Sequence, residues 1–142
     1  MLGAQISEGR GKRTGRRVLA TDPLKVEASV EEMTTLRDVA GLAIITYTSC
    51  IKPDGSLHGE GAGVFASLEG DIVTFRGVGV GRFGESGSVH YTGSVSYTTS
   101  SAKLAALNGI SGVFEWDIDA DGNTHSKICE MAAAGASQGA RA

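Results

Sequence analysis

A cysteine, two histidines and a glutamate carry the candidate chemistry of this chain. On neighbouring strands, Cys50, His58, Glu60 and His90 would bring thiol, imidazole and carboxylate groups to one end of a sheet. Such groups can bind a metal ion, and a Cys–His pair can act as nucleophile and base. Their spacing matches no metal-binding signature, and no motif supplies an oxyanion hole. We therefore predict a polar cluster without a metal, with Glu60 as the candidate group for proton transfer.

Strands must position these side chains, because the glycines follow the strand period of two. Glycines alternate with other residues over 59–63 and again over 77–81, and the chain holds 21 glycines in 142 residues. Turn signals such as Pro53-Asp54-Gly55 and Asp121-Gly122 separate the apolar runs. Strands are expected at 16–21, 24–29, 29–36, 41–51, 56–68, 71–83, 88–98, 110–119 and 123–131, with one short helix at 99–107. This order predicts an all-β fold, a single antiparallel up-and-down barrel of about eight strands with at most one short helix.

The register of the hairpins decides which side chains share a face. A two-residue turn at 69–70 would place Glu60 opposite Gly79, and a glycine bulge at Gly55 would place Cys50 opposite His58. One face then carries Cys50, His58, Glu60 and His90 near one end and Leu42, Ile44, Val64, Val73 and Phe75 at the other. The opposite face carries Ile45, Tyr47, Leu57, Phe65, Val78, Val80, Val89, Tyr91, Val95 and Tyr97. Both faces contain apolar runs, so the pattern leaves open which one lines the barrel. We take the first face as the candidate pocket, with Val64, Val73 and Phe75 as its apolar contacts.

Two further patterns resemble site signatures and fail as such. The acidic run 117–121 begins like a calcium loop, but Ile128 stands where a bidentate glutamate is needed. The glycine run 77–81 precedes no helix, so it lacks the dipole that would hold a phosphate. The first pattern predicts a hairpin turn, with Trp116 in the core.

Composition and charge limit the classes of partner that the chain is expected to bind. The formal net charge is −3, and no apolar run approaches the roughly 20 residues of a membrane span. We expect a flexible basic arm at 1–14, a barrel domain at 15–131 and a flexible tail at 132–142. The arm has no interleaved aromatic residues, so we expect no nucleic-acid partner and no membrane partner. No apolar secretory segment is recognisable, which favours the cytoplasm and reduced cysteines.

A resemblance supports the barrel. The runs from Lys52-Pro-Asp-Gly-Ser-Leu-His-Gly-Glu-Gly through Gly77-Val-Gly-Val-Gly-Arg-Phe to Leu107-Asn-Gly, and the close at Val113-Phe-Glu and Asp121-Gly-Asn, resemble a widespread set of uncharacterised prokaryotic proteins. The similarity covers roughly residues 12–131. More distantly, the glycine-rich hairpins resemble the allene-oxide-cyclase-type barrels of the calycin group. That resemblance implies a closed antiparallel barrel, often oligomeric, whose lumen holds an apolar small molecule, and it transfers no catalytic residue to this chain.

These observations favour a protein that binds a small apolar or amphipathic molecule, without a cofactor and as a homo-oligomer. Two alternatives stay open: a cyclase or isomerase that uses the barrel cavity, and a non-catalytic oligomeric structural protein.

Overall fold

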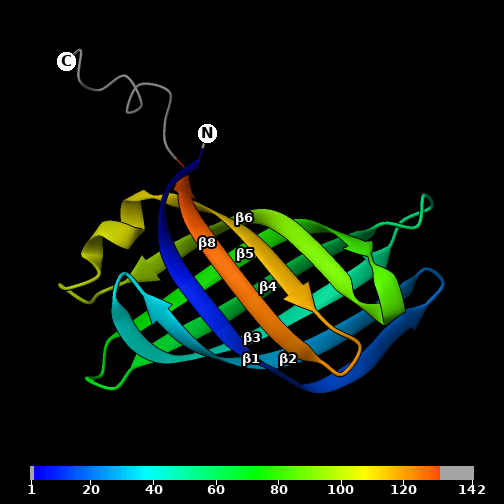
Figure 1. The fold of residues 1–142 in the computed structure, drawn as a ribbon, viewed down its shortest axis with the longest axis horizontal. Coiled ribbons are helices and arrows are strands. Elements are labelled where there is room, and N and C mark those ends of the chain that lie inside the picture. The colour runs from blue at the N-terminus through cyan, green and yellow to red at the C-terminus, as the bar shows by residue number, and fades with distance from the viewer. Residues whose placement is uncertain (1, 132–142) are drawn as a thin grey trace, which may run out of the picture.

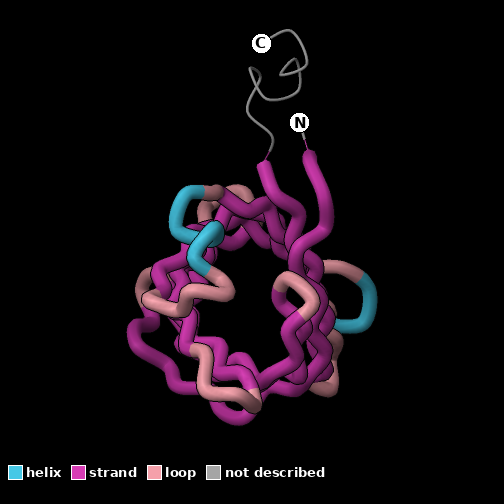
Figure 2. The backbone as a smooth tube through the Cα atoms, turned by 90° about the vertical axis from the view of Figure 1, so that its left-hand side faces the viewer, coloured by secondary structure: helices cyan, strands magenta, loops and turns pink. Residues whose placement is uncertain are grey.

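The structure is a computed structural model, and it describes residues 2–131 of the chain. Its strands are β1 (Leu2–Thr21), β2 (Leu24–Leu36), β3 (Val39–Ile51), β4 (Leu57–Ser67), β5 (Ile72–Phe83), β6 (Val89–Thr99), β7 (Ser111–Ile118) and β8 (Asn123–Met131). Each strand pairs antiparallel with the next, and β8 pairs with β1 to close the barrel. Figure 1 shows the tilted strands from the side, and Figure 2 looks along the barrel. The predicted antiparallel up-and-down barrel is confirmed.

The N-terminal segment differs from the expectation. Residues 2–14, predicted to be a flexible basic arm, belong to β1, which pairs with β8 from Leu2 to Lys12 and with β2 from Ser7 to Thr21. Glycine and charge made this segment look unstructured, yet they alternate with the strand period. Small residues such as Gly9 and Gly11 face the lumen, which leaves the charged residues between them on the outside. The predicted tail at 132–142 lies outside the described residues.

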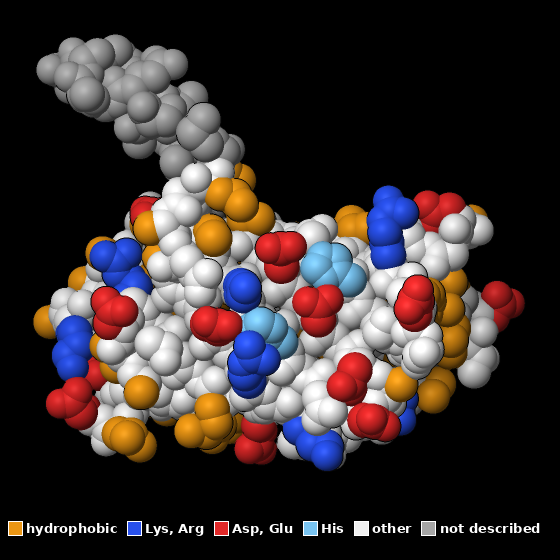
Figure 3. All heavy atoms as spheres, in the orientation of Figure 1, with side chains coloured by type: hydrophobic (Ala, Val, Ile, Leu, Met, Phe, Trp, Pro, Cys, Tyr) orange, Lys and Arg blue, Asp and Glu red, His pale blue; other side chains and the backbone are white. Residues whose placement is uncertain are grey.

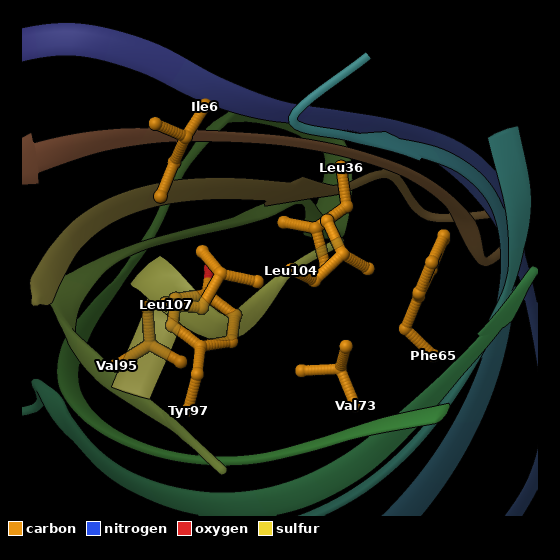
Figure 4. Packing of buried hydrophobic residues seen from close by; sticks show 8 residues of the cluster. All are labelled: Ile6, Leu36, Phe65, Val73, Val95, Tyr97, Leu104 and Leu107. Carbon is orange, nitrogen blue, oxygen red and sulfur yellow. The ribbon is translucent and has the colours of Figure 1, made fainter. Parts of the chain in front are cut away.

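One end of the barrel is closed by the segment between β6 and β7. This segment holds a short 3₁₀ helix, η2 (Ala105–Gly109), in place of the helix expected at 99–107. Leu104 and Leu107 are buried there. They pack in a cluster with Ile6, Leu36, Phe65, Val73, Val95 and Tyr97 (Figure 4). Within residues 2–131 no helix is long and apolar enough to cross a membrane.

The hairpin loops correct the predicted register. Ser67 and Asp71 bracket a three-residue loop, where the sequence analysis assumed a two-residue turn at 69–70. The pairing of β4 with β5 therefore shifts by one residue, and Gly59 lies opposite Gly79. A four-residue loop after Phe83 was expected to place His90 opposite Gly81, but Phe83 pairs with Val89 across a five-residue loop, so His90 pairs with Arg82. At Gly55, where a glycine bulge was predicted, Cys50 does lie opposite His58.

Aromatic rings fill the hollows that facing glycines leave. The rings of Phe114, Tyr91 and Phe75 lie over the inner surface of β4 and β5: a Cβ atom would lie 2.9 Å from Phe114 at Gly79 and 2.8 Å from Tyr91 at Gly59. The glycines therefore make room for rings from other positions in the wall. The alternating glycines, and the aromatic residues that cover them, line the lumen.

Candidate functional site

The barrel encloses a cavity of about 110 Å³. Its lining residues come from all eight strands, and most of them are apolar or glycine. Five of the lining residues combine an aromatic ring or a carboxylate with a buried inward position, namely Glu32, Tyr47, Tyr91, Tyr97 and Trp116, and we call these five residues the lumen site. All five lie on inward positions of their strands. The cavity is the candidate functional site because it combines an apolar wall with a few polar atoms.

Glu32 is the buried acidic residue of the lumen site, with 2% of its surface exposed. Its Oε2 accepts hydrogen bonds from Trp116 Nε1 at 2.9 Å and Thr124 Oγ1 at 2.7 Å, and its Oε1 accepts one from Ser126 Oγ at 2.7 Å. These donors lie on β7 and β8, across the barrel seam from β2. The three hydrogen bonds hold the carboxylate in one position against the inner wall.

Three aromatic rings form one corner of the cavity. The Tyr47 and Trp116 ring centroids are 4.8 Å apart with the planes at 68°, and the Tyr47 and Tyr91 centroids are 6.0 Å apart at 75°. The Tyr91 hydroxyl also forms a hydrogen bond with Ser49. Edge-to-face packing of this kind fixes the rings, and all three side chains line the cavity.

The lumen raises the pKa of its tyrosines, mainly because burial disfavours the phenolate. For Tyr47 the pKa rises to about 12, with Tyr91 adding to the effect and the charges of Arg13 and Arg16 opposing it. Burial likewise raises the pKa of Tyr97 and Tyr91. The Tyr97 hydroxyl is a buried polar atom with no hydrogen-bond partner in the described part of the chain. It is therefore an unsatisfied polar group within the apolar cluster at the closed end of the barrel.

The residues predicted as the pocket divide between the two faces of the wall. Val73 and Phe75 alternate inward, and Phe75 lines the cavity. Val64 and the polar group Cys50, His58, Glu60 and His90 occupy outward positions on β3, β4 and β6. The Glu60 side chain is 67% exposed and lies 3.3 Å from His58 Nε2. The candidate proton-transfer carboxylate thus faces solvent.

The outer wall pairs its histidines with carboxylates. His90 Nδ1 is 2.6 Å from Asp117 Oδ1, and His125 Nε2 is 2.7 Å from Glu8 Oε2. The hydrogen bond with His125 lowers the pKa of Glu8. Figure 3 shows one face of the outer wall, where histidines lie among acidic and basic side chains. Within residues 2–131 no group of three or more metal-ligating side chains could hold a metal ion.

Sequence reasoning missed Glu32 as a site residue. With Ser29 it matches a capping box, a helical signal that competes with the strand pattern of β2. The sequence does contain one indication of its position: Val30, Glu32, Thr34 and Leu36 alternate along the strand, which places the glutamate on the same face as Val30 and Leu36. Trp116 was predicted to lie in the core, and it is buried. Its contact with Glu32 depends on barrel closure, which no local pattern reports.

The comparisons show the fold. No protein-family model matches this chain, and no curated protein matches it. A conserved protein of unknown function from Rhodopseudomonas palustris superposes with a TM-score of 0.76 at 10% identity, covering 92% of this chain and 97% of that one. A protein of unknown function from Clostridium acetobutylicum gives 0.78 at 9% identity, covering 89% and 93%. A β-barrel-like protein from Acinetobacter baumannii gives 0.76 at 9%, covering 92% and 96%. The chain is thus similar in fold to bacterial β-barrel proteins over nearly its whole described length.

Proposed function

We propose that this protein binds a small, largely apolar molecule inside the barrel lumen. The observation that carries the proposal is the cavity of about 110 Å³, which is walled by aromatic rings and glycines. Native interiors are close-packed, and a void on this scale costs stability unless a ligand occupies it. The glycines of β4 and β5 leave room for the rings of Phe114 and Tyr91, which form part of the cavity wall.

The size of the cavity restricts the ligand. Pockets for drug-sized molecules measure roughly 300–1,000 Å³, whereas an engineered apolar cavity of about 150 Å³ holds benzene. A volume of about 110 Å³ therefore fits a molecule of about six non-hydrogen atoms. The resemblance to allene-oxide-cyclase-type barrels supports the same location, since it implies an apolar small molecule in the lumen.

The single tryptophan provides the test. Trp116 lines the cavity, so its fluorescence reports on the lumen. We expect benzene to change the emission in a saturable way. Ala43→Val should abolish saturation, because Ala43 lines the cavity and a larger side chain there fills it. Ala62→Val is the matched control, since Ala62 is exposed on the outside of β4. Saturation that survives Ala43→Val, or that never occurs with any ligand of this size, would refute the proposal.

The outer wall favours a second function, a homo-oligomeric structural protein. Met33, Leu42, Ala66 and Ile72 lie side by side across β2 to β5 in one apolar strip. Met33 and Ile72 are exposed. Such strips commonly mark interfaces. Sedimentation should show an oligomer. Met33→Lys should dissociate it, whereas the control Val18→Lys, at an exposed position on β1, should leave it intact. A monomer at high concentration would refute this function.

A further inference from the structure

We propose that the lumen site binds a small organic ammonium ion, a protonated amine with an apolar body. The inference rests on the proposed function, because it names the chemical class of the lumen ligand. Three features of the lumen site support it: an uncompensated charge, an acceptor position that no donor occupies and an aromatic corner.

The charge of Glu32 has no cationic partner. Its hydrogen-bond donors, Trp116, Thr124 and Ser126, are all neutral, and the ion pairs among residues 2–131 do not include it. Arg13 and Arg16 influence Tyr47 electrostatically, but neither forms an ion pair with this carboxylate. A buried charge without a counter-ion is costly, so a cationic ligand would gain more here than a neutral one.

One acceptor position on the carboxylate stays available. A carboxylate has about four lone-pair positions, and three are used here, two on Oε2 and one on Oε1. The backbone behind it is close: a Cβ atom at Gly9 would lie 2.5 Å from Oε1. Gly9 thus lets the carboxylate sit against the wall, with Glu32 still lining the cavity. An ammonium N–H can donate to the remaining position.

The aromatic corner suits a cation with carbon substituents. Tyr47, Tyr91 and Trp116 line the cavity with rings that meet at steep angles. Ring faces attract cations within about 6 Å of the centroid, most strongly for tryptophan. Trp116 also donates to Glu32, so the ring and the carboxylate are held in the same neighbourhood.

The experiment compares two probes of equal shape and different charge. Piperidinium and tetrahydropyran are six-membered rings with six non-hydrogen atoms, and at neutral pH the first is a cation and the second is neutral. Binding is measured by titration calorimetry and by Trp116 fluorescence. We expect piperidinium to bind at least about tenfold more tightly than tetrahydropyran.

Two variants assign the preference to its source. In Glu32→Gln the amide oxygen can take the place of Oε2 and accept from Trp116 and Thr124, while the amide nitrogen donates to Ser126 Oγ, so the fold is expected to persist. The preference for piperidinium should disappear in this variant, with tetrahydropyran binding retained. Glu31→Gln is the matched control, because Glu31 is the exposed neighbour on β2 and its loss removes the same charge from the outside. It should leave the preference unchanged.

Each outcome decides between the claims. Equal or tighter binding of tetrahydropyran by the unmodified protein would overturn the ammonium inference and leave the lumen function standing. Binding of neither probe nor of benzene would overturn both. A preference that persists in folded Glu32→Gln, checked by circular dichroism, would overturn the role of Glu32. If Glu32→Gln does not fold, the comparison of the two probes on the unmodified protein alone still decides the ligand class.

Discussion

Glu31 and Glu32 are adjacent on β2 and face opposite sides of the barrel wall. Glu31 is exposed to solvent, whereas Glu32 is buried and accepts hydrogen bonds from Trp116, Thr124 and Ser126. The two side chains are chemically identical, so their different roles come only from the strand period of two. In a closed barrel, the face of the wall decides whether a carboxylate can belong to a site.

The outer wall makes the same point with more residues. It carries the pairs His58–Glu60, His90–Asp117 and His125–Glu8, whose residue types are those used in proton transfer and metal binding. Exposed ion pairs contribute about 0–1 kcal/mol to stability, since water solvates both partners. The lumen holds fewer polar groups, but each one is placed by several contacts. The predictions below test this difference between the inner and outer faces, beginning with the largest expected effect.

Removing apolar volume should cost most at the closed end of the lumen. Leu107 is fully buried, and Leu107→Ala should lower the free energy of unfolding by about 3 kcal/mol through lost burial and a new cavity. Leu68→Ala, at a site 93% exposed, should change it by less than about 0.5 kcal/mol. Chemical denaturation measures both. Similar values for the two variants would contradict the assignment of Leu107 to the core.

Removing the carboxylates should separate the two neighbouring glutamates. Glu32→Ala leaves the Trp116 indole N–H and two hydroxyls without their acceptor, and should cost about 2 kcal/mol of unfolding free energy. Glu31→Ala should cost less than about 0.5 kcal/mol. Denaturation curves of the two variants give the comparison directly. Equal losses would show that the buried hydrogen bonds contribute nothing measurable.

Adding a methyl group should distinguish a glycine that faces the lumen from one that does not. At Gly79 a Cβ atom would lie 2.6 Å from the Thr92 carbonyl oxygen and 2.9 Å from the Phe114 ring, so Gly79→Ala should destabilise by about 1–2 kcal/mol. At Gly15 nothing lies within 4 Å, and Gly15→Ala should be neutral or slightly stabilising. Thermal melts followed by circular dichroism test the pair. A neutral Gly79→Ala would mean that Phe114 does not rest on this glycine.

Alkaline pH should lower stability through the buried tyrosines of the lumen. All three tyrosines have a raised pKa in the folded protein, and that of Tyr47 is about 12. A raised folded pKa means that stability is complete below the unfolded value of about 10 and falls as the pH rises towards the folded value. Phenolate absorbance should therefore appear above pH 10, together with unfolding. A tyrosine that titrates near pH 10 in the folded protein would lie outside the lumen.

The fold could be predicted because turns are local. Gly55, Gly70 and Gly122 all have positive φ, and each ends a loop that the sequence marks with an acidic residue and glycine. The register after Ser67 and after Phe83 could not be predicted, because a three-residue loop and its alternatives share the same composition. The first error moved the β5 side chains, Val73 and Phe75 among them, to the other face, and the second error moved β6 back, so His90 stays on the face of Glu60. Where the glycine bulge at Gly55 was recognised, the pairing of Cys50 with His58 was correct.

The site was harder to predict than the fold because its contacts are not local. Glu32 meets its donors on β7 and β8 only after the barrel closes. The hydrogen-bond capacity of a glutamate is the same wherever it stands, so residue type pointed to Glu60 and Glu32 equally. The predicted register also placed Glu60 opposite Gly79, whereas Gly79 lies opposite Gly59, and the rings of Phe114 and Tyr91 cover these two glycines.

The seam between β1 and β8 bears on how the chain is made. It joins the first and last described strands, with Gly11 opposite Thr124 (Figure 1). A nascent chain on the ribosome cannot complete this seam until β8 has emerged, so β1 and each newly made strand present open backbone edges throughout synthesis. Contacts of such high sequence separation also form slowly. Open strand edges are therefore exposed to aggregation during translation more than in the finished barrel.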